Sequence, residues 1–277
     1  MLLAAPLLLS SSGTPAYVQR VTLDEAKAAP VAGSPITGPA GAPLVVIDAG
    51  HGGHDPGAVA SNGIREKDVV LGLADALRDA LVEDGTVRIA MTRASDRFIP
   101  LEERTALARE LDADLFISIH ADSGGDEQNA AGASIYTLSA RASGQQAARF
   151  AARENRAGAV DGALRPPSDT TVDTMLFELS QRRALTEATE FARLLVREAS
   201  GELRFRDPPR RSAALIVLTA PDIPSVLLEA GFVTNLAEAE RMSSHEGQEQ
   251  FARVTAAAIR SYFANRDDRS TLTQQVR

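Results

Sequence analysis

Residues 44–57, LVVIDAGHGGHDPG, place two histidines and two aspartates in a glycine-rich turn after an apolar run. The run at 44–47 is typical of a strand that is buried on both faces. Glycines permit tight backbone turns and leave room beside the histidines for a ligand. Ligands bind at the carboxyl ends of strands in open α/β sheets. This segment therefore predicts part of a binding site.

Two later apolar runs also end in residues that could complete such a site. The run at 115–119 ends at His120, and the run at 225–228 ends at Glu229. Glu66 lies at the expected start of the helix that follows the first turn. An ionised carboxylate is seldom buried without a metal, a charge partner or a catalytic task, so Glu229 is the more informative residue. The structural alternatives are a salt bridge for Glu229 and an ordinary buried histidine for His120.

These residue types point to zinc chemistry. The chain has no cysteine, so any metal must be held by histidines and carboxylates. Two imidazoles and one carboxylate around an open fourth position are typical of a catalytic zinc site. Zinc makes water more acidic and stabilises an oxyanion, while a carboxylate outside the metal shell can move a proton to a leaving nitrogen. The spacing between His51 and Glu66 is too long for the HExxH helix of metalloproteases.

The elements that must position these residues alternate between strand and helix patterns, which predicts an α/β fold with a parallel-rich sheet. Residues 139–209 interrupt this alternation and are interpreted as an insertion, in which 204–211 is a solvated charged loop. The expected helices are 66–82, 100–111, 144–156, 178–199 and 236–265, and the further expected strands are 86–92, 133–138 and 213–219.

Composition limits the class of protein. The chain has 277 residues, 44% hydrophobic content and a net charge of −8, which suits one large acidic domain. No tryptophan and few aromatic residues argue against nucleic-acid binding. Residues 1–43 are interpreted as a signal-like segment and linker, and 266–277 as a polar tail, on either side of a catalytic domain at 44–265. The apolar start is shorter than a membrane span, so no stable membrane insertion is expected after processing.

Four sequence blocks resemble the zinc-dependent N-acetylmuramoyl-L-alanine amidases of the Amidase_3 type. That resemblance implies a three-layer fold with a mixed six-stranded sheet, with Zn²⁺ held by His51, Glu66 and His120 and with Glu229 as the catalytic carboxylate. It also implies a periplasmic or secreted enzyme that cuts peptidoglycan between N-acetylmuramic acid and the L-alanine of the stem peptide. The blocks are AGHGGHDPGA at 49–58, REKD at 65–68, SIHAD at 118–122 and PSVLLEAGFVTN at 224–235.

The insertion resembles the regulatory region of cell-separation amidases in this family. In those enzymes a helix plugs the groove and offers a carboxylate to the zinc. Here ARENRAG at 152–158 occupies the corresponding place, and Glu154 is the candidate blocking ligand. The hypothesis is an autoinhibited enzyme whose insertion helix is pulled away by an activator protein. The alternative for Glu154 is a solvated side chain on an ordinary helix.

Several further residues have expected roles around the site. His54 and Arg93 are candidate substrate contacts, and Arg104 could likewise bind stem-peptide carboxylates through bidentate pairing. Asp48 and Asp122 could orient the two ligand histidines through their other ring nitrogens. Salt bridges within the fold are the alternative for both arginines.

Two other functions remain open at this level. A zinc peptidase that cuts within the stem peptide would use the same metal chemistry with different groove contacts. A wall-binding protein without turnover is the other alternative. The presence of all three expected ligands together with Glu229 favours the enzyme.

Overall fold

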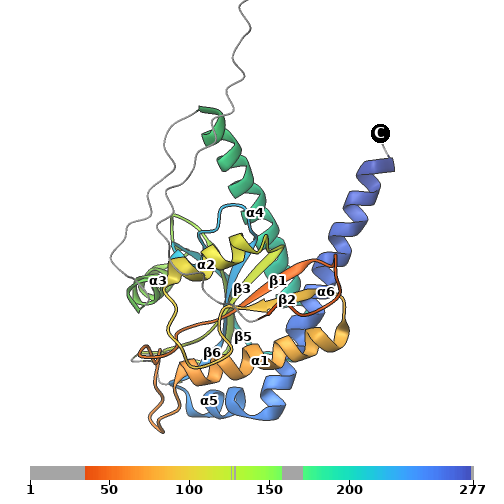
Figure 1. The fold of residues 1–277 in the computed structure, drawn as a ribbon. Helices are drawn as coiled ribbons and strands as arrows, with labels where there is room; N and C mark the ends of the chain where they lie inside the picture. The colour runs from red at the N-terminus through yellow and green to blue at the C-terminus, as the bar shows by residue number, and fades with distance from the viewer. Residues whose placement is uncertain (1–34, 126, 128, 158–170, 276–277) are drawn as a thin grey trace, which may run out of the picture. The chain divides into compact units, whose positions relative to one another are not determined.

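Six strands form one mixed sheet in the order β2-β1-β3-β6-β4-β5 in a computed structural model of the chain (Figure 1). The structure describes residues 35–275 apart from 126, 128 and 158–170, and only the backbone of 171–177 and 267–275. Most of the predicted signal-like segment and the middle of the predicted insertion lie outside the described residues. The elements are β1 (Leu44–Ala49), α1 (Glu66–Asp84), β2 (Arg88–Met91), α2 (Leu101–Glu110), β3 (Leu115–Asp122), β4 (Ala133–Leu138), α3 (Gln145–Ala157), α4 (Thr171–Glu198), β5 (Phe205–Ala213), η1 (Ile216–Leu218), β6 (Ser225–Phe232), α5 (Leu236–Ser243) and α6 (His245–Gln275).

The central strands are buried along their whole length. Every residue of β1, β3 and β6 is buried, as their uninterrupted apolar runs predict. Strands β2, β1, β3 and β6 run parallel, whereas β4 pairs antiparallel with β6. A parallel sheet needs cover on both faces, which explains the apolar runs at 44–47 and 226–228. Polar residues alternate with apolar ones only towards the end of β3, at Ser118, His120 and Asp122.

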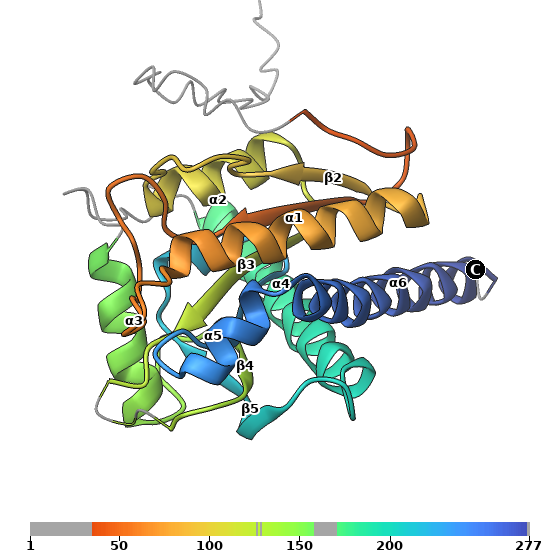
Figure 2. The same cartoon turned by 90° about the horizontal axis from the view of Figure 1, so that it is seen from below.

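Helices cover both faces of the sheet and make three layers (Figure 2). Alternate strand residues such as Val45 and Ile117 pack with α1, α4, α5 and α6 on one face. Their neighbours Val46 and Phe116 pack with α2, α3 and η1 on the other face. The predicted three-layer α/β fold with a mixed six-stranded sheet is confirmed. None of the helices in the described part of the chain combines the length and apolarity needed to cross a membrane.

Strand register places the site residues on the face that α2 and α3 cover. Paired residues on neighbouring strands point to the same face, and His120 of β3 pairs with Glu229 of β6. Ser118 lies two residues before His120 and shares its face, as does its partner Asp48 on β1. The carboxyl ends of three adjacent strands therefore bring polar side chains beneath α3.

Several predicted elements differ from the structure. The expected helix at 236–265 is two helices, α5 and α6, and α4 begins at Thr171 and not at 178. The fifth strand is β5 at Phe205–Ala213, not 213–219, and part of the latter segment forms the short helix η1. Residues 204–211 are therefore largely an edge strand and not a loop. The two prolines at 208 and 209 are compatible with that position because an edge strand has one unpaired side. Helix α6 also continues ten residues beyond its predicted end at Asn265, to Gln275 (275 − 265).

Candidate metal centre

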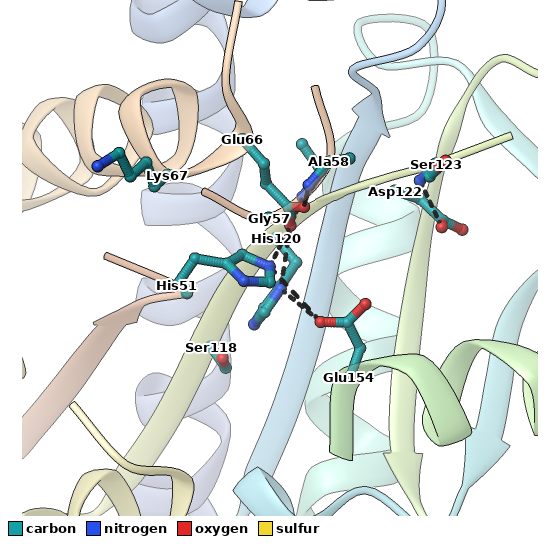
Figure 3. A network of polar contacts seen from close by, with 12 residues as sticks. His51, Gly57, Ala58, Glu66, Lys67, Ser118, His120, Asp122, Ser123 and Glu154 are labelled. Carbon is teal, nitrogen blue, oxygen red and sulfur yellow. Dashed lines mark hydrogen bonds and ion pairs between the residues drawn. The ribbon is translucent and has the colours of Figure 1, made fainter. Parts of the chain in front are cut away.

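Four polar side chains meet at one point beneath helix α3 (Figure 3). His51 follows β1, Glu66 begins α1, and His120 lies near the end of β3. Glu154 reaches the same point from α3 (Figure 3). Each of the four is exposed by 6% or less. The structure thus brings together the three residues expected to bind zinc and the one expected to block it.

Distances among the four side chains suit one small cation. Glu66 Oε1 lies 2.9 Å from His51 Nε2 and 3.1 Å from His120 Nδ1. Glu154 Oε2 lies 3.5 Å from each of these two nitrogens. Ligand atoms about 2.0–2.1 Å from a tetrahedral zinc ion lie roughly 3.3 Å from one another. The four donor atoms therefore have the mutual spacing of a zinc ligand set.

Burial and charge also favour a cation at this point. Burial lowers the pKa of His51, but the adjacent Glu66 and Asp55 carboxylates raise it to about 10. Burial raises the pKa of Glu154, and the nearby Glu66 carboxylate raises it further. His51 Nε2 is buried and has no hydrogen-bond partner among the described residues. The raised pKa of His51 reflects a site whose carboxylates attract positive charge, which a divalent metal ion can provide in place of the proton.

Asp55 fixes the orientation of the His51 ring. Its Oδ2 lies 2.8 Å from His51 Nδ1, so Nε2 faces Glu66 and Glu154. A carboxylate behind a metal-binding histidine fixes the ring and makes it a stronger ligand. This role of Asp55 was not predicted from the sequence. The available signal was an acidic residue four positions after His51 within the same glycine-rich turn.

Gly50 provides the space that the His120 ring occupies. A Cβ atom added at Gly50 would lie 2.4 Å from His120 Cε1 and Nε2, which is shorter than any tolerable contact. The glycines were expected to leave room beside the histidines for a ligand, but at Gly50 the space is filled by the protein's own His120 ring. His51 itself adopts φ 57°, which is uncommon for a residue with a side chain. The turn is thus under specific backbone constraint where it presents the ligand.

Glu229 lies beside the centre without any hydrogen bond of its own. Its exposed fraction is 0%, and neither carboxylate oxygen has a partner among the described residues. Burial raises the pKa of Glu229 well above its ordinary value, and the negative charge of Asp122 adds to the effect. In β6 it is paired with His120 of β3. A carboxyl group with raised proton affinity next to the ligands is well suited to hold or release a proton.

Two buried arginines hold the backbone of the His51 turn from behind. Arg93 donates to the carbonyls of Ala49 and Gly50, each at 2.8 Å. Arg104 donates to the carbonyl of His51 at 2.8 Å and also to that of Ala49. Both arginines are at most 2% exposed. The substrate contacts expected for Arg93 and Arg104 are therefore wrong, because both guanidinium groups already donate to backbone carbonyls inside the fold.

The two aspartates expected to orient the histidines have other partners. Asp48 accepts hydrogen bonds from Thr92 and Ser118, each at 2.6 Å. Asp122 accepts from Arg153 at 2.6 Å. Burial raises the pKa of Asp122, although the charge of Arg153 opposes that shift. The predicted contact with the histidine rings is wrong for both, because each carboxylate forms its side-chain hydrogen bonds elsewhere.

His54 lies outside the cluster. Its side chain is exposed, and its ring centroid lies 4.2 Å from that of Phe98. A substrate contact by His54 stays a prediction. His245 is exposed and pairs with Glu249 on α6.

Comparison with known proteins identifies the family. The Amidase_3 family, described as N-acetylmuramoyl-L-alanine amidase, matches residues 45–261. N-acetylmuramoyl-L-alanine amidase AmiA of Escherichia coli K12 is 36% identical over 221 residues, which is 79% of this chain and 76% of the relative. AmiC of Escherichia coli O6:H1 is 35% identical over 244 residues, and the match covers 87% of this chain but only 58% of that relative.

Solved structures agree with this assignment. N-acetylmuramoyl-L-alanine amidase AmiC2 of Nostoc punctiforme has a TM-score of 0.57 and 26% identity, covering 80% of this chain and 97% of that one. The catalytic domain of CwlV from Bacillus (Paenibacillus) polymyxa has a TM-score of 0.59 at 24% identity, covers 80% of this chain and 98% of that one, and shares the fold. The chain therefore belongs to the Amidase_3 family of N-acetylmuramoyl-L-alanine amidases, which confirms the predicted family and its class of hydrolytic enzyme.

Proposed function

We propose that the chain hydrolyses the amide bond between N-acetylmuramic acid and the L-alanine of the peptidoglycan stem peptide, with Zn²⁺ as its cofactor. The observation that carries this proposal is the convergence of His51, Glu66 and His120 within 3.1 Å contacts beside the unpartnered Glu229. Membership of the amidase family supplies the identity of the bond. Two imidazoles and a carboxylate leave one position open for substrate or water.

The proposed reaction divides the work between the ligands and Glu229. When bound, a zinc ion acidifies water and polarises the carbonyl of the scissile amide. Glu229 then accepts a proton from the attacking water and donates it to the amide nitrogen as the bond breaks. Its burial and raised pKa support both steps, because the carboxyl must exist in each protonation state during one turnover. Asp55 keeps the His51 ring oriented throughout.

Helix α3 supports a second part of the proposal, which is autoinhibition. Glu154 Oε2 stands at 3.5 Å from both ligand histidines, where a fourth ligand or a substrate oxygen would have to come. Arg153 fixes that helix by donating both to Glu154 at 3.0 Å and to Asp122 at 2.6 Å. In this arrangement the substrate cannot reach the centre until α3 moves. An activator protein that binds the insertion is the proposed agent of that movement.

The proposed site of action lies outside the cytoplasmic membrane, in the periplasm or beyond it. Support comes from the location of peptidoglycan and from the signal-like composition of the first residues.

A product analysis tests the proposed activity. Purified zinc-loaded chain is incubated with peptidoglycan sacculi, and the soluble products are measured by mass spectrometry. The expected product is an intact stem peptide with a free N-terminal L-alanine, together with peptide-free glycan. Fragments cut within the stem peptide would assign a zinc peptidase instead. Absence of any product, also from a variant in which Glu154 no longer occupies the centre, would exclude both enzymes.

A further inference from the structure

A row of arginines runs along helix α3 and continues on strand β5. Helix α3 contributes Arg149, Arg153 and Arg156, whose spacings of four and three residues place them on one helix face (153 − 149 and 156 − 153). Strand β5, against which α3 packs, contributes Arg206 and Arg211. These five residues are called the arginine stripe below.

Gln146 joins the two parts of the stripe. Its side-chain oxygen lies 3.5 Å from Arg206 Nη2 and 3.3 Å from Arg211 Nη1, and both nitrogens donate to it. Gln146 precedes Arg149 by one helical turn, so the β5 arginines reach the start of the α3 row. The stripe is therefore continuous from the edge of the sheet to the helix that covers the metal centre.

Four of the five stripe arginines have no acidic partner among the described residues, although some arginines outside the stripe share this property. Among the described residues, no ion pair involves Arg149, Arg156, Arg206 or Arg211. Arg211 Nε is also buried without a hydrogen-bond partner in the described part of the chain. Arg153 is the exception, since it pairs with the site residues Asp122 and Glu154. Arginines elsewhere with carboxylate partners are Arg65, Arg78, Arg104, Arg109, Arg183, Arg197, Arg241, Arg253, Arg260 and Arg266.

Unpaired positive charge on an acidic protein favours an anionic partner at this place. The chain carries a net charge of −8, so most of its surface repels a polyanion. Guanidinium groups bind carboxylates with two parallel hydrogen bonds, and exposed Arg149 and Arg156 are free to do so. A row of such groups suits a polymer that carries carboxylates at intervals better than it suits a single small anion.

We infer that the arginine stripe is a docking surface for peptidoglycan, where it binds the carboxylates of stem peptides that are not being cut. The inference rests on the proposed function for the identity of the polymer. The direction of the stripe favours peptidoglycan over another polyanion. Arg153 is adjacent in sequence to Glu154, so a strand held along the stripe lies beside the covered metal centre, and its stem peptides reach the centre only when α3 moves. The docked polymer and the reacting amide then belong to one substrate.

A binding experiment with matched variants tests the docking surface. Arg149→Gln/Arg156→Gln removes two exposed stripe charges, and Arg182→Gln/Arg193→Gln removes two exposed charges from α4. Each pair is made in zinc-loaded chain carrying Glu229→Gln, which prevents digestion during sedimentation with sacculi at low salt. The stripe variant is expected to bind about three- to tenfold more weakly than the α4 variant, with the difference reduced at high salt.

Other outcomes would overturn the inference. Equal binding by the two variants at low salt would show that the stripe does not contact the polymer. A loss of binding to vesicles of anionic phospholipid, with sacculus binding intact, would assign the stripe to a membrane surface instead. Circular dichroism and zinc content serve as controls for folding. The proposed function is tested separately by product analysis, so docking without hydrolysis and hydrolysis without docking are distinguishable.

Discussion

Glu229 and the three ligands have separable tasks at the scale of single residues. Among the ligands, Glu66 lies within 3.1 Å of both His51 and His120, whereas neither carboxylate oxygen of Glu229 has a hydrogen-bond partner among the described residues. A residue that is buried without a partner destabilises the fold unless its function requires that environment. For Glu229 the proposed function is proton transfer, which depends on a carboxyl group and not on its shape alone.

Glu229→Gln is therefore expected to keep zinc and to lose turnover by about 10²- to 10⁴-fold, because the amide cannot accept the proton. The measurement is the release of stem peptide from sacculi together with zinc content by atomic absorption. Glu240→Gln, an exposed change on α5, is the control and should behave like the parent chain. His120→Ala should lose both zinc and activity. If Glu229→Gln released stem peptide at the parent rate, the assignment of the proton carrier would be wrong.

Arg104 is expected to affect zinc through the backbone of the His51 turn. Arg104→Lys keeps the charge but cannot donate to the carbonyls of both Ala49 and His51 in the same fork geometry. We expect about 10- to 100-fold weaker zinc binding, the usual effect of losing an outer-shell contact, measured by competition with a chelating dye. Arg109→Lys on the same helix is the control, since Arg109 is exposed and pairs with Asp222. Equal zinc affinity for the two variants would contradict this role.

Sequence patterns predicted the residues of the centre better than their orientation. His51 and His120 follow apolar runs, and parallel strands with ends at one edge of the sheet bring such residues together. Which neighbouring acid supports which ring depends on side-chain directions in the turn, so Asp55 was missed and Asp48 was assigned wrongly. The burial of Arg93 could not be predicted from the sequence either, because the carbonyl groups that it binds come together only in the folded turn.

Helix α3 covers the centre at the scale of secondary-structure elements, and the proposed autoinhibition depends on this position. Phe150 and Ala151 pack into the core that lies on the same face of the sheet as the site. The polar contacts of Arg153 and Glu154 add to this packing at the centre itself. The helix is thus held by contacts that must break together when the substrate enters.

Glu154→Ala is expected to raise the basal rate of the purified chain. If the open arrangement is a minor state of 0.1–10%, removal of the blocking carboxylate raises turnover by about 10- to 1,000-fold. Zinc should remain bound, since three ligands are unchanged. Gln145→Ala, an exposed change in the first turn of α3, is the control and should leave the basal rate low. The autoinhibition proposal fails if both variants turn over sacculi at the parent rate.

The predicted elements were most accurate where a strand is buried on both faces. The runs that form β1, β3 and β6 are continuously apolar because helices cover both sides of them. β5 was misplaced because FRDPPRRSA contains neither an apolar run nor clean alternation. Its place at the sheet edge follows from pairing with β4, a tertiary contact that the local sequence does not encode.

At the scale of the whole molecule, the metal is expected to stabilise the fold. The four ligand-bearing residues come from β1, α1, β3 and α3, so one ion links segments that are distant in sequence. Zinc at about 1,000 times its dissociation constant contributes roughly 4 kcal/mol. Removal with a chelator should therefore lower the midpoint of thermal unfolding by roughly 10 °C, measured by calorimetry. Zinc should restore the midpoint and magnesium should not. An unchanged midpoint would indicate that no metal occupies the centre.

Helix α3 lies between β4 and β5 in the chain. The residue proposed to inhibit the enzyme therefore lies in a different segment from the residues proposed to carry out the reaction. His51, Glu66, His120 and Glu229 all belong to β1, β3, β6 or the connections beside them, whereas Glu154 alone comes from the segment between the last two strands of the sheet order. That segment can be shortened, lengthened or replaced without altering any strand that carries the reacting groups. The proposed inhibitory segment can therefore change during evolution while the residues of the metal centre stay the same.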